Sequence, residues 1–213
     1  MTDRLKEIFS VLPECEVFAD IGCDHGYLSY EMLKSGKAKK VLFSDISAKC
    51  LQKAKGLLAE YIDSNRAFGY VTSGFNDLPQ SNLALIAGMG GEEINAIINC
   101  AKFLPEKLVL QPMKNTEKVR ENLIKKGYKI EKDYTFKAKK KFYDLIFARK
   151  GTDFLTQEEL YFGRTNLALK PLAFIEKLTD RKVALQGFLQ SEELSQESKN
   201  ELKKELERIE KIC

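Results

Sequence analysis

Glycines and carboxylates gather in one short stretch near the N-terminus, and their spacing indicates a ligand-binding turn. The stretch 20–27 reads DIGCDHGY and follows an apolar run typical of a strand. Glycines between a strand and a helix let a ligand approach the backbone closely. A nicotinamide dinucleotide turn would read G-x-G-x-x-G, but Asp24 and Tyr27 stand at its second and third glycine positions. The acidic turn therefore favours a cationic, hydroxyl-rich ligand such as S-adenosylmethionine; a purely structural turn is the alternative.

Further polar residues follow the next strands of the predicted sheet. Asp45 ends the second strand, where a carboxylate is expected to bind ribose hydroxyls; capping of the following helix is the alternative. After the third strand, either Asn76 or Asp77 can accept a hydrogen bond from an adenine amino group. Three glycines among residues 88–91 free the backbone after the fourth strand.

The cysteine and histidine content excludes several classes of site. The five cysteines show no C-x-x-C spacing and the chain has one histidine, which argues against a disulfide framework, a zinc site and a Ser-His-Asp triad. No apolar run reaches transmembrane length, and the N-terminus lacks the apolar core of a signal peptide. We therefore expect a cytoplasmic protein with reduced thiols, no metal and no membrane partner.

Hydrophobic periodicity predicts alternating strands and helices that would hold these turns. The expected strands are 16–21, 40–44, 68–72, 83–87, 107–111, 128–137 and 142–149, and the expected helices are 3–12, 28–35, 47–61, 92–102 and 116–126, with Asp3, Ser47 and Thr116 as N-caps. This order predicts an α/β fold: a mostly parallel sheet with helices on both faces and one antiparallel edge element. The apolar run 83–87 should be its central strand. Ligands then bind beyond the carboxyl ends of the strands, at the switch point.

A length of 213 residues suits one domain with an appendage, which we place at 1–152 and 153–213. In the appendage, apolar residues recur at three- and four-residue steps over 171–190 and 195–212, with 190–196 as a turn. Its seam would comprise Leu172, Ile175, Leu178, Leu185, Leu189, Leu202, Leu206, Ile209 and Cys213. This spacing predicts a helical hairpin with coiled-coil-like packing.

Positive charge is concentrated in the predicted strand pair. Residues 125–150 contain 10 Lys+Arg and 3 Asp+Glu, whereas the net charge of the whole chain is only +4. Lys137, Lys139, Lys140 and Lys141 alternate with aromatic residues there, which is typical of a surface that contacts RNA phosphates. A solvated hairpin tip is the alternative.

Four motifs support a family resemblance. DIGCDHGYL, SDIS, IAGMGG and LQPMKN, in this order and spacing, resemble the bacterial tRNA (adenine(22)-N(1))-methyltransferase family, and the resemblance extends over essentially the whole chain. It implies a Rossmann-like S-adenosylmethionine-dependent methyltransferase fold with a C-terminal coiled-coil hairpin. It also implies methylation of N1 of adenine 22 in tRNA. A monomer is favoured, and the oligomeric state is left open.

The resemblance implies roles for individual residues. The cofactor-binding set is Asp20, Gly22, Gly26, Asp45, Ile46, Asn76, Asp77 and Gly88. The methyl-transfer set is Asp24, Tyr27, Met89, Gln111 and Pro112, with His25 facing the same pocket. Two other functions stay open: a related methyltransferase that acts on a protein or small molecule, and a non-catalytic RNA-binding module.

Overall fold

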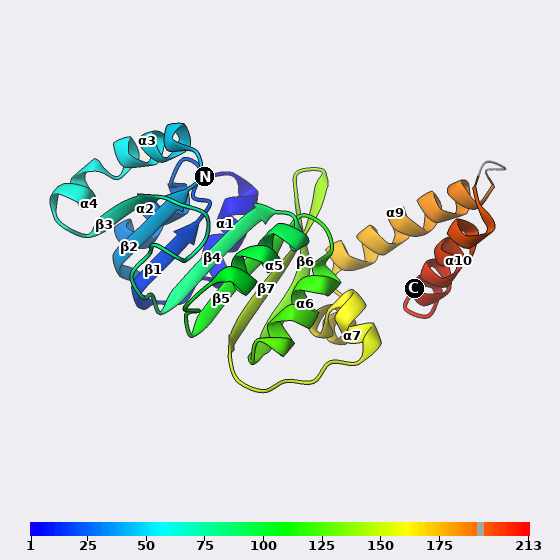
Figure 1. Ribbon diagram of the computed structural model, residues 1–213. Coiled ribbons are helices and arrows are strands. Elements are labelled where there is room, and N and C mark those ends of the chain that lie inside the picture. Colours follow the sequence, from blue (N-terminus) through cyan, green and yellow to red (C-terminus); the bar gives the residue numbers. More distant parts are fainter. Residues whose placement is uncertain (191–193) are drawn as a thin grey trace.

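A computed structural model describes residues 1–190 and 194–213 of the chain, which fold around a seven-stranded sheet (Figure 1). The strands are β1 (Cys15–Ile21), β2 (Ala38–Asp45), β3 (Ala67–Val71), β4 (Leu83–Met89), β5 (Lys107–Pro112), β6 (Tyr128–Ala138) and β7 (Lys141–Lys150). Their order is β3-β2-β1-β4-β5-β7-β6, and β7 is antiparallel to both of its neighbours. The predicted mostly parallel sheet is confirmed, with the antiparallel pair at one edge.

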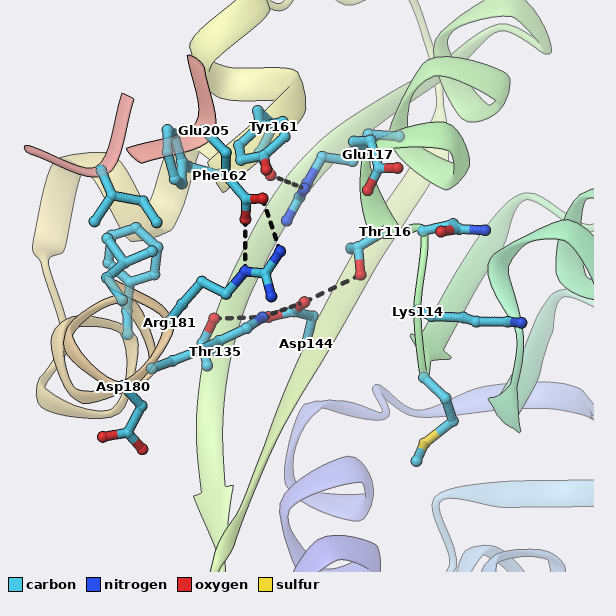
Figure 2. Close-up of a pocket in the computed structure, with 17 residues that line it drawn as sticks. Lys114, Thr116, Glu117, Thr135, Asp144, Tyr161, Phe162, Asp180, Arg181 and Glu205 are labelled. Carbon is cyan, nitrogen blue, oxygen red and sulfur yellow. Dashed lines mark hydrogen bonds and ion pairs between the residues drawn. The ribbon is translucent and has the colours of Figure 1, made fainter. Parts of the chain in front are cut away.

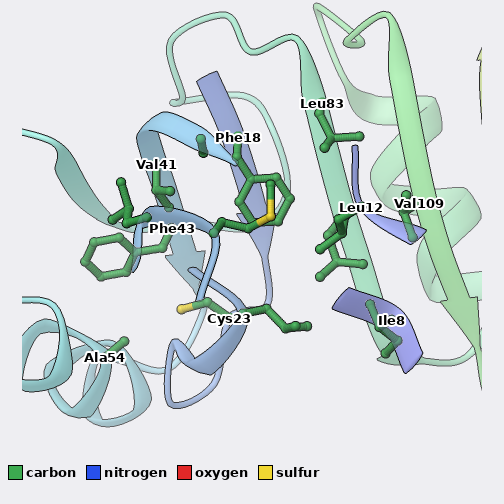
Figure 3. Packing of buried hydrophobic residues seen from close by; sticks show 14 of the residues in the cluster. Ile8, Leu12, Phe18, Cys23, Val41, Phe43, Ala54, Leu83 and Val109 are labelled. Atoms are coloured by element: carbon green, nitrogen blue, oxygen red, sulfur yellow. The ribbon is translucent and has the colours of Figure 1, made fainter. Parts of the chain in front are cut away.

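Helices cover both faces of this sheet. They are α1 (Asp3–Val11), α2 (Tyr27–Lys34), α3 (Ala48–Leu57), α4 (Ala59–Asp63), α5 (Gly91–Cys100), α6 (Thr116–Lys125), α7 (Gln157–Phe162), α8 (Arg164–Leu169), α9 (Leu172–Leu189) and α10 (Gln196–Glu210). One core lies between the sheet and α1, α2 and α3 (Figure 3), and a second lies beneath α5 and α6.

The central strand supplies both cores. Leu83 and Leu85 of β4 belong to the first core, whereas Ala84 and Ile86 belong to the second. Successive side chains of a strand point to opposite faces, so a strand covered on both sides must be apolar throughout. This explains the continuous apolar run that predicted a central strand, and β4 is indeed the middle strand of the seven.

Several helix ends differ from the predicted ones. Thr2 caps α1 in place of Asp3, because its hydroxyl accepts from the amide of Leu5. Asn115, in the left-handed conformation, precedes α6, whereas the Thr116 hydroxyl donates to Asp144 instead of capping the helix. The predicted helix 47–61 is broken at residue 58 into α3 and α4.

Helices α7 and α8 were not predicted. Each has six residues, which is too short to show an apolar period. A capping box formed by Thr156 and Glu159 starts α7. Asn166 of α8 is buried, where its side chain accepts from the Thr135 amide and donates to the Phe162 carbonyl. These short helices are therefore held by contacts with the sheet domain and with each other.

Helices α9 and α10 form a helical arm that projects from the sheet domain (Figure 1). Leu178, Leu185 and Ile209 are buried in its seam, as predicted. Phe174 of α9 and Phe162 of α7 are buried with them. Leu172 is 74% exposed and Cys213 is also exposed, so their predicted places in the seam are wrong. The predicted turn 190–196 lies partly outside the described residues. No helix among the described residues is both long and apolar enough to cross a membrane.

Candidate functional site

A cavity of about 500 Å³ opens at the switch point of the sheet, between the loops that follow β1 and β4. This is the place predicted from the strand order, because β1 and β4 are neighbours whose connections lead to opposite halves of the sheet. Its wall contains Arg4, Ile21, Gly22, Asp24, Asp45, Ile46, Thr72, Ser73, Gly74, Ala87, Gly88, Met89, Glu93, Ala96, Ile97 and Cys100. Six of these are predicted site residues: Gly22, Asp24, Asp45, Ile46, Gly88 and Met89.

Asp45 connects the wall of this cavity to the first loop. Its carboxylate accepts from the backbone amide of Asp24 at 3.1 Å and from that of Ser47 at 2.8 Å. The amides of Gly22 and Cys23 both donate to the Ser44 carbonyl. The acidic end of β2 therefore fixes the glycine-bearing turn after β1, while the half-buried Asp45 still borders the cavity.

Two glycines of the turn do different work. Gly22 has φ +73°, and a Cβ there would lie 2.1 Å from Met89 Cε, so a larger residue would displace Met89. Gly26 also has φ +73°, but a Cβ there would meet the Cβ of Ala54 on α3 at 2.9 Å. Gly26 is absent from the walls of the described cavities and sets the packing of α2 against α3.

Asp20 lies beneath the turn, beside a smaller cavity of about 90 Å³. Its side chain is buried and accepts a hydrogen bond of 2.7 Å from the Ser29 hydroxyl. Burial raises the pKa of Asp20 to about 6, although the hydrogen bonds from Ser29 oppose the shift. The hydrogen bond between Asp20 and Ser29 therefore links the end of β1 to α2 across the turn.

Asp24 begins a short chain of polar contacts on the rim. Its carboxylate lies 2.8 Å from His25 Nδ1, and His25 Nε2 lies 3.2 Å from the Lys53 ammonium. Because an ammonium only donates, Nε2 accepts and Nδ1 carries the proton that it donates to Asp24. Both ring nitrogens are thereby engaged, and His25 orients Asp24. The left-handed backbone at Asp24, with φ 49°, turns this 69% exposed side chain outward.

The remaining methyl-transfer candidates lie outside the wall of the switch-point cavity: Tyr27 lines two smaller cavities beside it, whereas Gln111 and Pro112 line none of the described cavities. Tyr27 is 48% exposed, and its ring stacks on His25 with centroids 5.9 Å apart. Gln111 is fully buried and donates through Nε2 to the carbonyl of its neighbour Pro112 at 3.0 Å. The amide of Met113 donates to the Met89 carbonyl, which joins the loops after β4 and β5.

Arg4 is a residue of this site that the sequence motifs did not reveal. It projects from α1, and its Nη1 donates to Gln111 Oε1 at 2.7 Å. It lines the cavities of about 500 and 90 Å³ and a third of about 450 Å³. The sequence predicted α1 only from the apolar residues on one face. A single arginine outside that face matches no known sequence motif, so its place in the site was not predicted.

The loop after β3 enters the cavity with different residues from those predicted. Thr72, Ser73 and Gly74 line the wall, whereas Asn76 and Asp77 are exposed and outside it. Asp77 accepts a hydrogen bond of 2.6 Å from the Thr72 hydroxyl. In this arrangement, Thr72 and Ser73 are nearer candidates for an adenine contact.

The basic hairpin β6–β7 ends on the same edge of the sheet. The third cavity is shared by Lys139 and Tyr143 of the hairpin with His25 and Tyr27 of the rim. Lys140 and Lys141 are exposed next to it. Lys137 is directed elsewhere: it pairs with Glu176 of α9 and lies over the Phe142 ring.

A separate cavity of about 710 Å³ lies between the sheet domain and the arm (Figure 2). At its base, Asp144 accepts from Lys177 at 2.7 and 2.8 Å, and from the hydroxyls of Thr116 and Thr135. Across it, Arg181 binds both carboxylate oxygens of Glu205. We call Arg120, Asp133, Asp144 and Lys177 the arm root.

The comparisons with known proteins agree with this geometry. A family model described as "Methyltransferase domain" matches residues 1–146. The chain belongs to this methyltransferase family. It is 34% identical over 157 residues to a Mycoplasma pneumoniae protein named "Putative tRNA methyltransferase", an alignment that covers 70% of this chain and 71% of that protein.

Two further relatives are more specific in name. The tRNA (adenine(22)-N(1))-methyltransferase of Bacillus subtilis is 29% identical over 162 residues, which cover 71% of this chain and 66% of that one. The structure of M. capricolum TrmK with S-adenosylhomocysteine matches 99% of this chain and 96% of its own, with a TM-score of 0.90 and 20% identity. The resemblance to the tRNA (adenine(22)-N(1))-methyltransferase family and the Rossmann-like fold are thus confirmed. The alignments span about two thirds of the curated relatives' length.

Proposed function

We propose that this methyltransferase transfers the methyl group of S-adenosylmethionine to N1 of adenine 22 in tRNA. The observation that carries the proposal is the cavity at the switch point, with Asp45 at the expected ribose position and Asp24 on the rim beside it. The family membership supports the reaction class, and the names of the relatives support the substrate. We also propose that the chain acts in the cytoplasm and as a monomer.

The cavity fits the proposed cofactor in size and chemistry. About 500 Å³ lies within the range of small-molecule sites. Asp45 can accept from ribose hydroxyls, and the loop 72–74 with Ile97 of α5 can hold the adenine. The acidic residues Asp24 and Glu93 suit a ligand that carries a sulfonium and an ammonium group. When bound, S-adenosylmethionine supplies the methyl group.

Adenine N1 carries an in-plane lone pair, so it can attack the sulfonium methyl without first losing a proton. The protein must therefore hold N1, the methyl carbon and the sulfur in line at near-attack distance. The target base must be turned out of the folded RNA. The exposed Tyr27 ring, steadied by its stack on His25, and Met89 are the side chains available to hold that base.

Asp24 is the residue proposed to act on the developing charge. Methylation at N1 leaves a positive charge on the ring, and a carboxylate that accepts from the exocyclic amine stabilises it. His25 and Lys53 hold one side of Asp24 in place. Such a preorganised contact contributes about 2–4 kcal/mol to the transition state.

The direct test is methyl transfer to two tRNA transcripts that differ at one position. A transcript with adenine 22 should accept one methyl group from labelled S-adenosylmethionine, and the same transcript with guanine 22 should accept none. Equal labelling of both would contradict the assigned position. Methylation of protein or a small molecule without tRNA would favour the competing enzyme class, and cofactor binding without any transfer would favour the RNA-binding module.

The RNA surface is tested separately at the hairpin tip. Replacing Lys139, Lys140 and Lys141 with alanine should weaken tRNA binding. It should also make the logarithm of the tRNA binding constant depend less steeply on the logarithm of salt concentration, with unchanged cofactor affinity. The matched control replaces Lys125, Lys126 and Lys129, which lie at the end of α6 and the start of β6, at the far end of the strand from the hairpin tip. Equal effects of the two triple variants would remove the tip from the tRNA contact.

A further inference from the structure

One cation stands among the acidic groups of the switch-point cavity. The charged residues in its wall are Arg4, Asp24, Asp45 and Glu93. In the smaller cavity beneath the turn, Arg4 is again the permanent cation, beside Asp20 and Asp24. The carboxylates suit the positive groups of a ligand, and the single guanidinium suits an anionic group on the same ligand.

The cofactor assigned under the proposed function carries one such group. S-adenosylmethionine has a sulfonium, an ammonium and a carboxylate. In the proposed function, Asp45 binds its ribose and the loop 72–74 with α5 holds the adenine, and all of these line the cavity. The amino-acid end must then extend toward Gly22 and Gly88, which is where Arg4 lies: a Cβ on Gly88 would be 3.1 Å from Arg4 Nη1.

Arg4 has donors to spare for this carboxylate. Of its five N–H groups, one on Nη1 is used by Gln111 Oε1 at 2.7 Å. Within the described part of the chain, Nη2 and Nε have no protein acceptor. The Gln111 side chain also donates to the Pro112 carbonyl, which holds it in place. Its hydrogen bond with Nη1 therefore fixes the position of the guanidinium and leaves the other N–H groups free to bind a ligand. The Tyr143 ring lies 5.9 Å from the guanidinium carbon on another side.

We infer that Arg4 of α1 binds the carboxylate of the methionine part of S-adenosylmethionine, and so decides which end of the cofactor faces the N-terminal helix. The inference rests on the proposed cofactor. A charged donor fork and a carboxylate form one of the stronger pairings available to a protein. Loss of the pair should lower affinity about 10- to 100-fold.

The test compares two ligands that differ only in this carboxylate. Binding of S-adenosylmethionine and of decarboxylated S-adenosylmethionine is measured by calorimetry on the full chain, on Arg4→Met and on Arg4→Lys. The unaltered chain should prefer the carboxylate-bearing ligand by about 10- to 100-fold. Arg4→Met should bind the two ligands within about threefold of each other, and Arg4→Lys should lie between, because a point charge lacks the donor fork. Lys6→Met on the same helix, whose partner is the exposed Asp3, is the control and should retain the full preference.

Two results would overturn the inference. The unaltered chain could show no preference, or Arg4→Met could weaken both ligands by the same factor and keep the preference, which would mean that Arg4 acts only through Gln111. Both results leave the proposed function intact, because S-adenosylmethionine still binds. Failure of the unaltered chain to bind S-adenosylmethionine at all would overturn the inference and the proposed function together.

Discussion

Carboxylates lie close together both at the switch-point cavity and at the arm root, but they differ in their exposure and in their partners. At the cavity, Asp24 and Asp45 are held mainly by backbone amides and His25, and they remain accessible. At the root, Asp133 is fully buried against Arg120, and Asp144 is bound by Lys177 and two hydroxyls. Accessible carboxylates can meet a ligand, whereas carboxylates with a full set of partners can only hold the fold.

The pKa values of two buried aspartates make the same contrast. Burial raises the pKa of Asp20, which has the Ser29 hydroxyl but no cation as a hydrogen-bond partner. Burial acts in the same direction on Asp144, but the charges of Lys177 and Arg120 and the hydrogen bonds from Lys177 and Thr135 outweigh it, and the pKa is lowered. The difference lies in the cations, because both side chains are removed from water.

The largest expected effect is the loss of the buried ion pair at the root. Arg120→Met leaves Asp133 without its cation and removes two hydrogen bonds to carbonyls of α7, so we expect the free energy of unfolding to fall by about 3–5 kcal/mol. Urea denaturation measures this. The matched control is Arg181→Met, which breaks a half-exposed pair with Glu205 and should cost about 1 kcal/mol or less. Equal losses in the two variants would remove the distinction between root and surface.

Next in size is a change at the cavity that should spare stability. Asp24→Asn keeps the shape of the side chain, and asparagine tolerates the left-handed backbone found there. Single-turnover methyl transfer should fall about 10²-fold or more, which corresponds to roughly 2.7 kcal/mol. Asp63→Asn on α4 is the control. A normal rate with a lower melting temperature and weaker cofactor binding would show that Asp24 only orders the loop.

A somewhat smaller loss is expected at the second cavity carboxylate. Asp45→Ala removes the proposed acceptor for the ribose and should weaken S-adenosylmethionine binding by about 1.5–3 kcal/mol. Calorimetry on the variant measures the affinity directly. An unchanged dissociation constant would exclude Asp45 from the cofactor site and leave it only its two backbone contacts.

The last expected effects are opposite pH dependences of stability, measured without cofactor. The pKa of Asp20 rises from 3.8 to about 6 on folding, so its ionisation costs stability as pH rises through that window, and Asp20→Asn should abolish this decline. The pKa of Asp144 is lowered, so its contribution is present above the ordinary carboxyl pKa and is lost as pH falls through the lower, folded value. Asp144→Asn should remove that acid-side loss. Unfolding free energies measured across pH 3–7 would test both signs, and parallel profiles would refute the contrast.

The residues of the switch-point cavity could be predicted from the sequence more fully than those of the arm root, for a physical reason. Strand ends converge at one edge of a parallel sheet, so Gly22, Asp45 and Gly88 could be brought together from strand order alone. No such rule pairs Arg120 with Asp133, because charged residues on a helix and a strand usually face water. Packing of α7 and α8 against the sheet domain buries Arg120 and Asp133. Each of these helices has only six residues, so no sequence pattern predicted them.

Within the site, too, the motifs could be predicted from the sequence, whereas contacts between distant elements could not. The motif around Asp24 was recognisable, but the contacts of His25 with Lys53 depend on a helix that lies 28 residues further along the chain. Asn76 and Asp77 were reasonable adenine partners by position, yet the loop turns their side chains outward and presents Thr72 to Gly74 instead. Arg4 was missed because only the fold brings α1 over the carboxyl ends of the strands.

The length of α9 gives the arm root a mechanical meaning. With 18 residues, the helix is a lever about 27 Å long. Lys177 lies in the second turn of the helix, so about 18 Å of α9 extends beyond its hydrogen bonds to Asp144. A tilt of roughly 10° about that point would move the far end of the helix by about 3 Å, the length of one hydrogen bond. The two hydrogen bonds between Asp144 and Lys177 therefore act close to the pivot of a long helix, and a small change in them becomes a larger displacement of α10.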